Sequence, residues 1–290
     1  MRTLPLSLAG IVLGVFLAVA DYFVSAPVVV FLALTTVSLQ ILSNLSNELG
    51  DALSGTDNER RVGMIYSIQE GDITIPEMKT LVNVMSVVSV IFGTIMIRLS
   101  FGSFFSVSSI TFYLLGAFAI WAARHYTLGK NPYGYRGLGD LYVFLFFGIA
   151  TVVGGYYLCT HELVSAKMLL PAAAIGFFSV AVLNVNNIRD MKTDAATRVT
   201  VAMRLGEKGS RIYHTILIVL GWAAMFVYCS LRMFSIWHYL FVLALPLFVK
   251  HLVGVWKRKD EELDPMLPLL VMSSFLFSIL AGIGFVVFLF

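Results

Sequence analysis

One stretch decides the fold of this chain: Asn44-Leu45-Ser46-Asn47-Glu48-Leu49-Gly50-Asp51, which continues to Gly55-Thr56-Asp57. It directly follows an apolar run, so we predict that it closes a membrane helix. Its polar side chains recur at helical spacing and therefore share one helical face: Asn44, Asn47, Glu48 and Asp51. Ionisable groups beside lipid are costly, and they usually have both a partner and a function. This polar face is therefore a candidate site.

A second polar stretch, from Asn184 to Asp194, ends another long apolar run. Its residues Asn187, Asp190 and Asp194 lie within about 40° of a common helical face. The stretch also repeats the Asn-x-x-Asn spacing of the first one. Carboxylate and amide oxygens are ligands of hard cations, and such cations commonly bind phosphorylated substrates. We therefore predict that the two stretches meet and bind Mg²⁺ together with a phosphorylated substrate.

The composition is that of a membrane protein. Hydrophobic residues make up 59% of the 290 residues and charged residues only 13%, against about 25% in soluble domains. We expect a lipid bilayer as the environment of the protein and no nucleic acid as a partner. The two cysteines, Cys159 and Cys229, lie far apart in apolar runs, which predicts neither a disulfide framework nor a zinc site.

Apolar runs long enough to span a bilayer predict an all-α, polytopic membrane protein with a single domain over residues 1–290. There are nine such runs, at about 4–24, 27–47, 79–99, 103–123, 139–160, 167–188, 212–231, 235–256 and 266–289. We also predict that Pro76 begins the third spanning helix. The connections after the second, fourth, sixth and eighth runs are the longer and more polar ones.

The charges predict the orientation. With nine spans, the N-terminus and the longer connections share one side, and this side carries 17 of the 20 lysines and arginines. Because basic residues collect on the cytoplasmic side of membrane proteins, both acidic stretches are expected to face the cytoplasm. Soluble phosphorylated metabolites and Mg²⁺ are available there.

The connection from Arg124 to Asp140 is rich in glycine, tyrosine and basic residues, as in an ordered loop that contacts a ligand. Its basic residues, together with Arg60, are candidate donors to an anionic substrate: Lys130 and Arg136. The charge bias of cytoplasmic loops explains these basic residues equally well. The tyrosines have the same two readings, as ligand contacts or as residues of the membrane interface: Tyr126, Tyr133 and Tyr135.

On these residues the chain resembles the UbiA-type intramembrane prenyltransferases. The stretch from Asn47 to Asp57 is similar to the family's first motif, Asn-Asp-x-x-Asp, and Asp190-x-x-x-Asp194 to its second. A third segment, Tyr126-Thr…Pro132-Tyr-Gly-Tyr…Gly137-Leu-Gly-Asp140, is similar to the branch of the family that acts in menaquinone synthesis.

The resemblance implies helices around a central cavity in a bacterial cell (inner) membrane, and a Mg²⁺-dependent reaction. A polyprenyl group would pass from polyprenyl diphosphate to 1,4-dihydroxy-2-naphthoate, with loss of CO₂ and diphosphate, giving demethylmenaquinone. Metal ligands would be Asn47, Asp51, Asp57, Asp190 and Asp194. Catalytic residues would be Asp51, Asp190 and Tyr126, and substrate contacts Asn44, Asn47, Arg60, Lys130, Arg136 and Asn187.

The chain also departs from the family pattern. Glu48 stands where the family usually has Asp, and Thr197-Arg198-Val199-Thr200 replaces the usual Gly-Lys-x-Thr with one residue fewer before it. This shift leaves open whether Arg198 contacts phosphate.

Two alternatives remain. Another branch of the superfamily would prenylate a different aromatic acceptor, such as 4-hydroxybenzoate. A transporter would use buried carboxylates to couple ions, but transporters hold such groups near the bilayer midplane on broken helices. Here the acidic residues lie at or beyond the helix ends.

Overall fold

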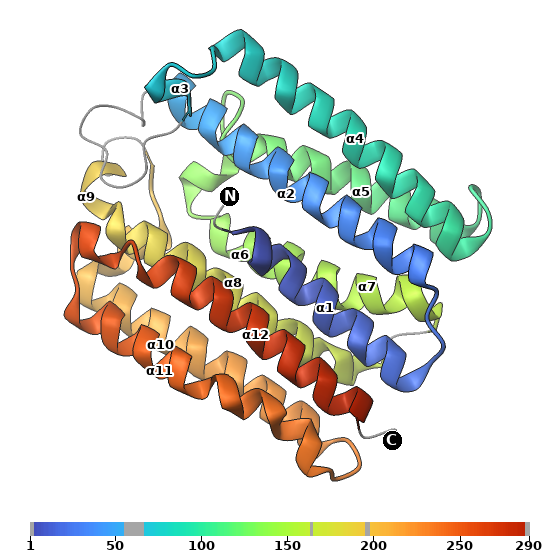
Figure 1. The fold of residues 1–290 in the computed structure, drawn as a ribbon. Coiled ribbons are helices and arrows are strands. Elements are labelled where there is room, and N and C mark those ends of the chain that lie inside the picture. The colour runs from blue at the N-terminus through green and yellow to red at the C-terminus, as the bar shows by residue number, and fades with distance from the viewer. Residues whose placement is uncertain (1–2, 55–66, 163–164, 195–197, 288–290) are drawn as a thin grey trace.

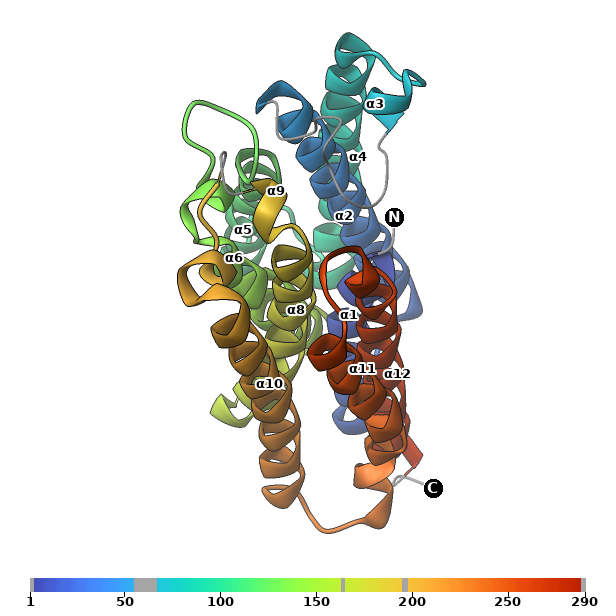
Figure 2. The same cartoon turned by 90° about the vertical axis from the view of Figure 1, so that its left-hand side faces the viewer.

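The computed structural model describes residues 3–54, 67–162, 165–194 and 198–287. All regular structure in these residues is helical, and Figures 1 and 2 show long helices that run roughly side by side. The elements are α1 (Leu4–Asp21), α2 (Ala26–Ser54), α3 (Ser67–Glu70), α4 (Ile75–Phe101), α5 (Val107–His125), η1 (Tyr133–Arg136), α6 (Gly139–Val143), η2 (Phe144–Ala150), α7 (Thr151–Thr160), η3 (Ala166–Met168), α8 (Leu169–Arg189), α9 (Met191–Asp194), α10 (Val201–Ser230), η4 (Ile236–Ala244), α11 (Leu245–Lys257), η5 (Asp260–Leu263) and α12 (Met266–Val287).

Nine helical segments of the described chain are long and apolar enough to cross a membrane, which confirms the predicted number. They are α1, α2, α4, α5, α6 with η2 and α7, η3 with α8, α10, η4 with α11, and η5 with α12. Helices α2 and α10 extend furthest beyond the predicted apolar runs. Helix α2 continues to Ser54, so the polar face found in the sequence is part of the helix. Helix α10 begins at Val201, with a break at Gly206, where φ is 69°.

Helix α8 is the central helix of the bundle. It packs against α10, η2 and α12, and its buried side chains include many small ones. Small residues allow close approach: a Cβ on Gly176 would lie 2.7 Å from the ring of Phe144. A Cβ on Gly148, in the π-helical turn η2, would lie 2.6 Å from the carbonyl oxygen of Ala172. This contact fixes the position of α8, and therefore that of the polar residues at its end.

Helix α4 begins as the sequence predicted. Thr74 caps it, accepting a hydrogen bond from the backbone N–H of Glu77, whose carboxylate in turn accepts from the N–H of Thr74. Pro76 occupies the first turn, where a missing N–H has no consequence. Figure 1 shows the N-terminus of α4 near the C-terminus of α2, with the short helix α3 close to both.

The polar ends of several helices gather at one end of the bundle. Figures 1 and 2 show the C-terminal end of α2, the loop before α6, α9 and the beginning of α10 at the same end. A Cβ on Gly50 would lie 2.4 Å from the hydroxyl of Thr127, so α2 and the loop after α5 are in direct contact. The two acidic stretches of the sequence thus lie on the same side of the molecule.

The close packing at Gly148 predicts that Gly148→Ala destabilises the protein. The new methyl group meets backbone atoms of α8, which cannot move aside, and overpacking of this kind costs about 1–3 kcal/mol. Gly116→Ala in α5 is the matched control, because its Cβ would meet nothing within 4 Å. Denaturation of the purified variants in detergent would measure the difference. Equal stability of the two variants would contradict the packing that places α8.

Candidate active site

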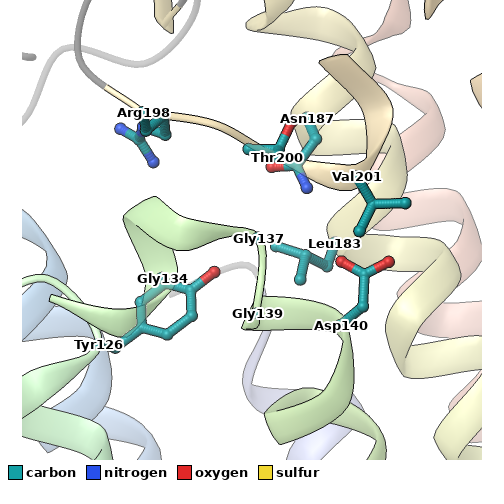
Figure 3. Close-up of a pocket in the computed structure, with 10 residues that line it drawn as sticks. All are labelled: Tyr126, Gly134, Gly137, Gly139, Asp140, Leu183, Asn187, Arg198, Thr200 and Val201. Atoms are coloured by element: carbon teal, nitrogen blue, oxygen red, sulfur yellow. The ribbon is translucent and has the colours of Figure 1, made fainter. Parts of the chain in front are cut away.

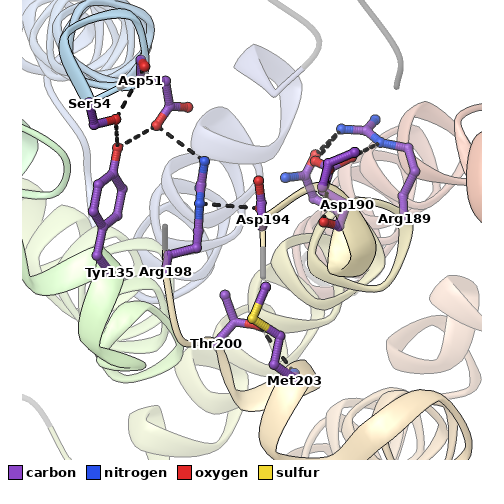
Figure 4. A network of polar contacts seen from close by, with 11 residues as sticks. Asp51, Ser54, Tyr135, Arg189, Asp190, Asp194, Arg198, Thr200 and Met203 are labelled. Carbon is purple, nitrogen blue, oxygen red and sulfur yellow. Dashed lines mark hydrogen bonds and ion pairs between the residues drawn. The ribbon is translucent and has the colours of Figure 1, made fainter. Parts of the chain in front are cut away.

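Arg198 joins the two acidic stretches. Its Nη2 lies 3.2 Å from Oδ1 of Asp51 on α2, and its Nε lies 3.2 Å from Oδ2 of Asp194 at the end of α9 (Figure 4). Both carboxylates are buried, with 6% of each residue exposed. Two residues far apart in the sequence therefore share one positive group at the end of the helices.

Tyr135 completes this contact from the loop before α6. Its hydroxyl donates a hydrogen bond of 2.7 Å to Oδ1 of Asp51, and its ring centroid lies 5.1 Å from the guanidinium carbon of Arg198. Its carbonyl oxygen accepts a hydrogen bond from the N–H of Val199 at 3.0 Å. The hydroxyl of Ser54 lies 3.0 Å from that of Tyr135. We refer to Asp51, Asp194, Arg198 and Tyr135 as the bridging cluster.

Asp190 lies beside the bridging cluster but pairs with a different arginine. Arg189 donates from Nε and Nη2 to the two oxygens of Asp190, at 2.7 and 2.8 Å. The same guanidinium reaches Oδ1 of Asp264, just before α12, at 2.7 Å, and also Asn186 at 2.8 Å. The two networks are linked through the backbone, since the N–H of Asp194 donates to the carbonyl of Asp190.

A small pocket opens next to the bridging cluster (Figure 3). It is lined by Tyr126, Gly134, Gly137, Gly139, Asp140, Leu183, Asn187, Arg198, Thr200 and Val201. The glycines allow the loop to fold onto Tyr126: a Cβ on Gly134 would lie 2.6 Å from its carbonyl oxygen, and one on Gly139 2.9 Å from its hydroxyl. The loop therefore packs closely against Tyr126.

The surroundings fix the protonation of the groups at this end. Burial raises the pKa of Tyr126 above its usual value, so this phenol stays neutral and can donate a hydrogen bond. Burial alone would lower the pKa of Arg198, but the charges of Asp51 and Asp194 raise it overall. The site therefore combines the positive charge of Arg198 with the neutral phenol of Tyr126.

The other predicted site residues lie in different surroundings. Asn187 is buried and lines the pocket. Asn47 accepts a 3.4 Å hydrogen bond from Thr127, and Asn44 one of 3.1 Å from Gln40. Lys130 and Arg136 are exposed. The remaining two, Asp57 and Arg60, lie outside the described residues.

The carboxylates at this end are suited to bind a hard cation together with the phosphate groups of a substrate. The described residues contain no group of three or more His, Cys, Asp or Glu side chains close enough to hold a metal ion by themselves. Mg²⁺ in phosphoryl sites is commonly held by one or two carboxylates together with substrate phosphates and water. Asp51 and Asp194, which already share a positive group, are oxygen donors of this kind.

Sequence reasoning left open or missed several residues of these networks. Arg198 follows Asp194 by four residues, and this helical spacing was a usable sign of the ion pair. The contact between Tyr135 and Asp51 joins distant segments, and nothing local in the sequence indicated it. Arg189 was visible only as the residue before Asp190, without a sign that it also reaches Asp264.

In the part of the chain that the structure describes, nine segments long enough to span a membrane carry buried acidic side chains at one end, which suits an intramembrane enzyme, and the comparisons agree. The chain matches the model of the UbiA prenyltransferase family over residues 7–288 and belongs to that family. It is 39% identical to 1,4-dihydroxy-2-naphthoate octaprenyltransferase of Haemophilus influenzae, over 99% of this chain and 93% of the relative. Identity to the enzyme of the same name from Escherichia coli is 38%, over 98% and 92%.

Solved structures support the fold. A UbiA homologue from Aeropyrum pernix in its apo form superposes with a TM-score of 0.70 at 16% identity, covering 100% of this chain and 97% of that one. A UbiA homologue from Archaeoglobus fulgidus, bound to DMAPP and Mg²⁺, gives 0.65 at 14% identity, covering 99% and 98%. The all-α polytopic fold predicted from the sequence is confirmed.

The pairing of Asp190 predicts that Arg189→Met destabilises the protein. The substitution leaves a buried carboxylate without its bidentate partner, and breaking a buried ion pair in this way typically costs about 3–5 kcal/mol. Lys192→Met is the matched control, because the pair between Lys192 and Asp260 is exposed and its loss should change stability little. Denaturation in detergent measures both variants. If Arg189→Met unfolded like the control, the Asp190 pair would not hold this end together.

Proposed function

We propose that this protein transfers a polyprenyl group from polyprenyl diphosphate to 1,4-dihydroxy-2-naphthoate, with loss of diphosphate and CO₂, to give demethylmenaquinone. The observation that carries the proposal is the meeting of Asp51 and Asp194 on one guanidinium at the end of membrane-spanning helices. The identity of the acceptor is supported by relatives of that name, which are 38% and 39% identical over nearly the whole chain.

The position of the site suits such a donor. A polyprenyl diphosphate has an apolar tail, which dissolves in the membrane, and a charged head group, which needs cations. The bridging cluster lies near the end of α2 and at the end of α9, beyond the predicted apolar runs, so a head group bound there could leave its tail in the membrane. A transporter site near the bilayer midplane does not fit this position.

Mg²⁺ would be held by Asp51, Asp190, Asp194 and Asn47, with Asp57 as a further ligand. When bound, it supplies Lewis-acid stabilisation of the departing diphosphate. The family members that bind DMAPP with Mg²⁺ support this assignment at the level of the fold.

The residues of the chain have separate tasks in this proposal. Arg198 donates charge-assisted hydrogen bonds to the phosphate oxygens, which spread the negative charge of the leaving group. Lys130, Arg136 and Arg60 add donors from the loops. Tyr126 lines the pocket, and its aromatic face stabilises positive charge on the allylic carbon by about 1–2 kcal/mol once water is excluded. Asn187 and Asn44 contact the substrates.

This end of the protein faces the cytoplasm of a bacterial cell, where the head group and the metal are accessible. The basis is the charge distribution, with 17 of 20 basic residues on the side of the N-terminus and the longer connections.

The test of the function is a reaction of the purified protein with Mg²⁺, 1,4-dihydroxy-2-naphthoate and prenyl diphosphates of several lengths. We expect a product whose mass equals that of the acceptor plus the prenyl group minus CO₂. Parallel reactions with 4-hydroxybenzoate should give little product. Preferential prenylation of 4-hydroxybenzoate would reject the acceptor, and no transfer to either would reject the function.

Within the same assay, Asp51→Asn and Asp190→Asn should each abolish measurable transfer, because the amide no longer offers a charged ligand. Both substitutions preserve side-chain size, and each buried arginine keeps a second carboxylate, Asp194 for Arg198 and Asp264 for Arg189, so folding in detergent should be retained. Full activity of both variants with Mg²⁺ would remove the proposed metal site.

Cysteine labelling tests the orientation. In spheroplasts, Lys130→Cys should react with a membrane-impermeant maleimide only after permeabilisation, whereas Lys167→Cys should react at once. Both positions are exposed, and the native Cys159 and Cys229 are buried, so background labelling is low. The opposite pattern would reverse the orientation.

A further inference from the structure

Tyr135 stands at the junction of three segments that are distant in sequence. Its hydroxyl contacts the end of α2, its ring faces Arg198, and its backbone carbonyl binds the segment before α10 (Figure 4). Tyr135 therefore connects the loop before α6 to both acidic stretches. It contacts Asp51 directly, and it contacts Arg198, which in turn pairs with Asp194.

The geometry of these contacts fixes two side chains at once. Oδ1 of Asp51 accepts from the Tyr135 hydroxyl at 2.7 Å and from Nη2 of Arg198 at 3.2 Å. Because one oxygen accepts two donors from different directions, the rotation of the carboxylate is defined. The ring of Tyr135 lies against the guanidinium, which restricts the plane of that group as well.

The sequence alone left two roles for Tyr135, interfacial anchoring and contact with a substrate. The structure separates it from Tyr126, which lines the pocket, whereas Tyr135 is not among the lining residues. The ring of Tyr135 is occupied by the guanidinium of Arg198, and its hydroxyl by Asp51. Its contacts are therefore with the groups that would bind the diphosphate and its metal.

We propose that Tyr135 is a positioning residue, which holds Asp51 and Arg198 in the arrangement that binds the metal–diphosphate group. The inference rests on the proposed function, because it assumes that these two side chains form the donor site. Residues that orient metal ligands through hydrogen bonds typically contribute about 10–100-fold to metal affinity. Removal of the hydroxyl should therefore weaken binding by roughly tenfold.

Binding of Mg²⁺ with inorganic pyrophosphate to the full-length protein in detergent, measured by calorimetry, tests the proposal. Tyr135→Phe removes the hydroxyl and keeps the ring, whereas Tyr135→Leu removes both. We expect roughly tenfold weaker binding for Tyr135→Phe and a larger loss for Tyr135→Leu. Tyr157→Phe is the matched control, since it removes a tyrosine hydroxyl that pairs with Ser108 in another part of the bundle. Its affinity should equal that of the unaltered protein.

Steady-state kinetics add a second measurement. A positioning role raises the KM for the prenyl diphosphate and the Mg²⁺ concentration needed for half-maximal rate, and changes kcat less. If Tyr135→Phe binds pyrophosphate as the unaltered protein does, the proposal is wrong, even where kcat falls. If the unaltered protein binds no pyrophosphate with Mg²⁺, the donor site of the proposed function fails and this inference fails with it.

Discussion

The structure of the site depends on charge neutralisation at the end of the membrane-spanning helices. Asp51 and Asp194 are buried, and isolated buried carboxylates are expensive unless a positive group compensates them. The single positive charge of Arg198 is shared between the two, and Arg189 pairs with Asp190. The arginines thus offset part of the cost of burying acidic side chains where the proposed metal and diphosphate would bind.

Close packing between helices positions the acidic residues of the site. Helix α8 is held by close backbone contacts with η2, so Asp190 at its end has a defined position. Helix α2 is held at Gly50 against Thr127, which places Asp51 beside the loop that carries Tyr135. Small residues in the bundle therefore determine where the charged residues meet, and the proposed activity depends on that meeting.

Much of the fold and part of the candidate site could be predicted from the sequence. The contacts that could not be predicted have a physical reason. The spans follow from apolar runs, and the start of α4 from Pro76, because both are local properties. The polar face from Asn44 to Asp51 was predicted from helical spacing. The structure agrees, because α2 stays helical beyond the predicted apolar run, to Ser54. The partners of the carboxylates were not predicted, since a contact such as that of Tyr135 with Asp51 depends on the packing of distant segments. The central cavity, the metal ligands and the roles of Lys130 and Arg136 remain predictions.

The guanidinium of Arg189 is shared between the ends of two helices, α8 and α12. It binds Asp190 at the end of α8 and Asp264 at the entrance to α12 with equally short contacts. A ligand that withdraws Asp190 leaves the contacts of this arginine with Asp264 and Asn186 in place. Arg189 therefore links the end of α8, where the proposed head group would bind, to the start of the helix that packs along α1.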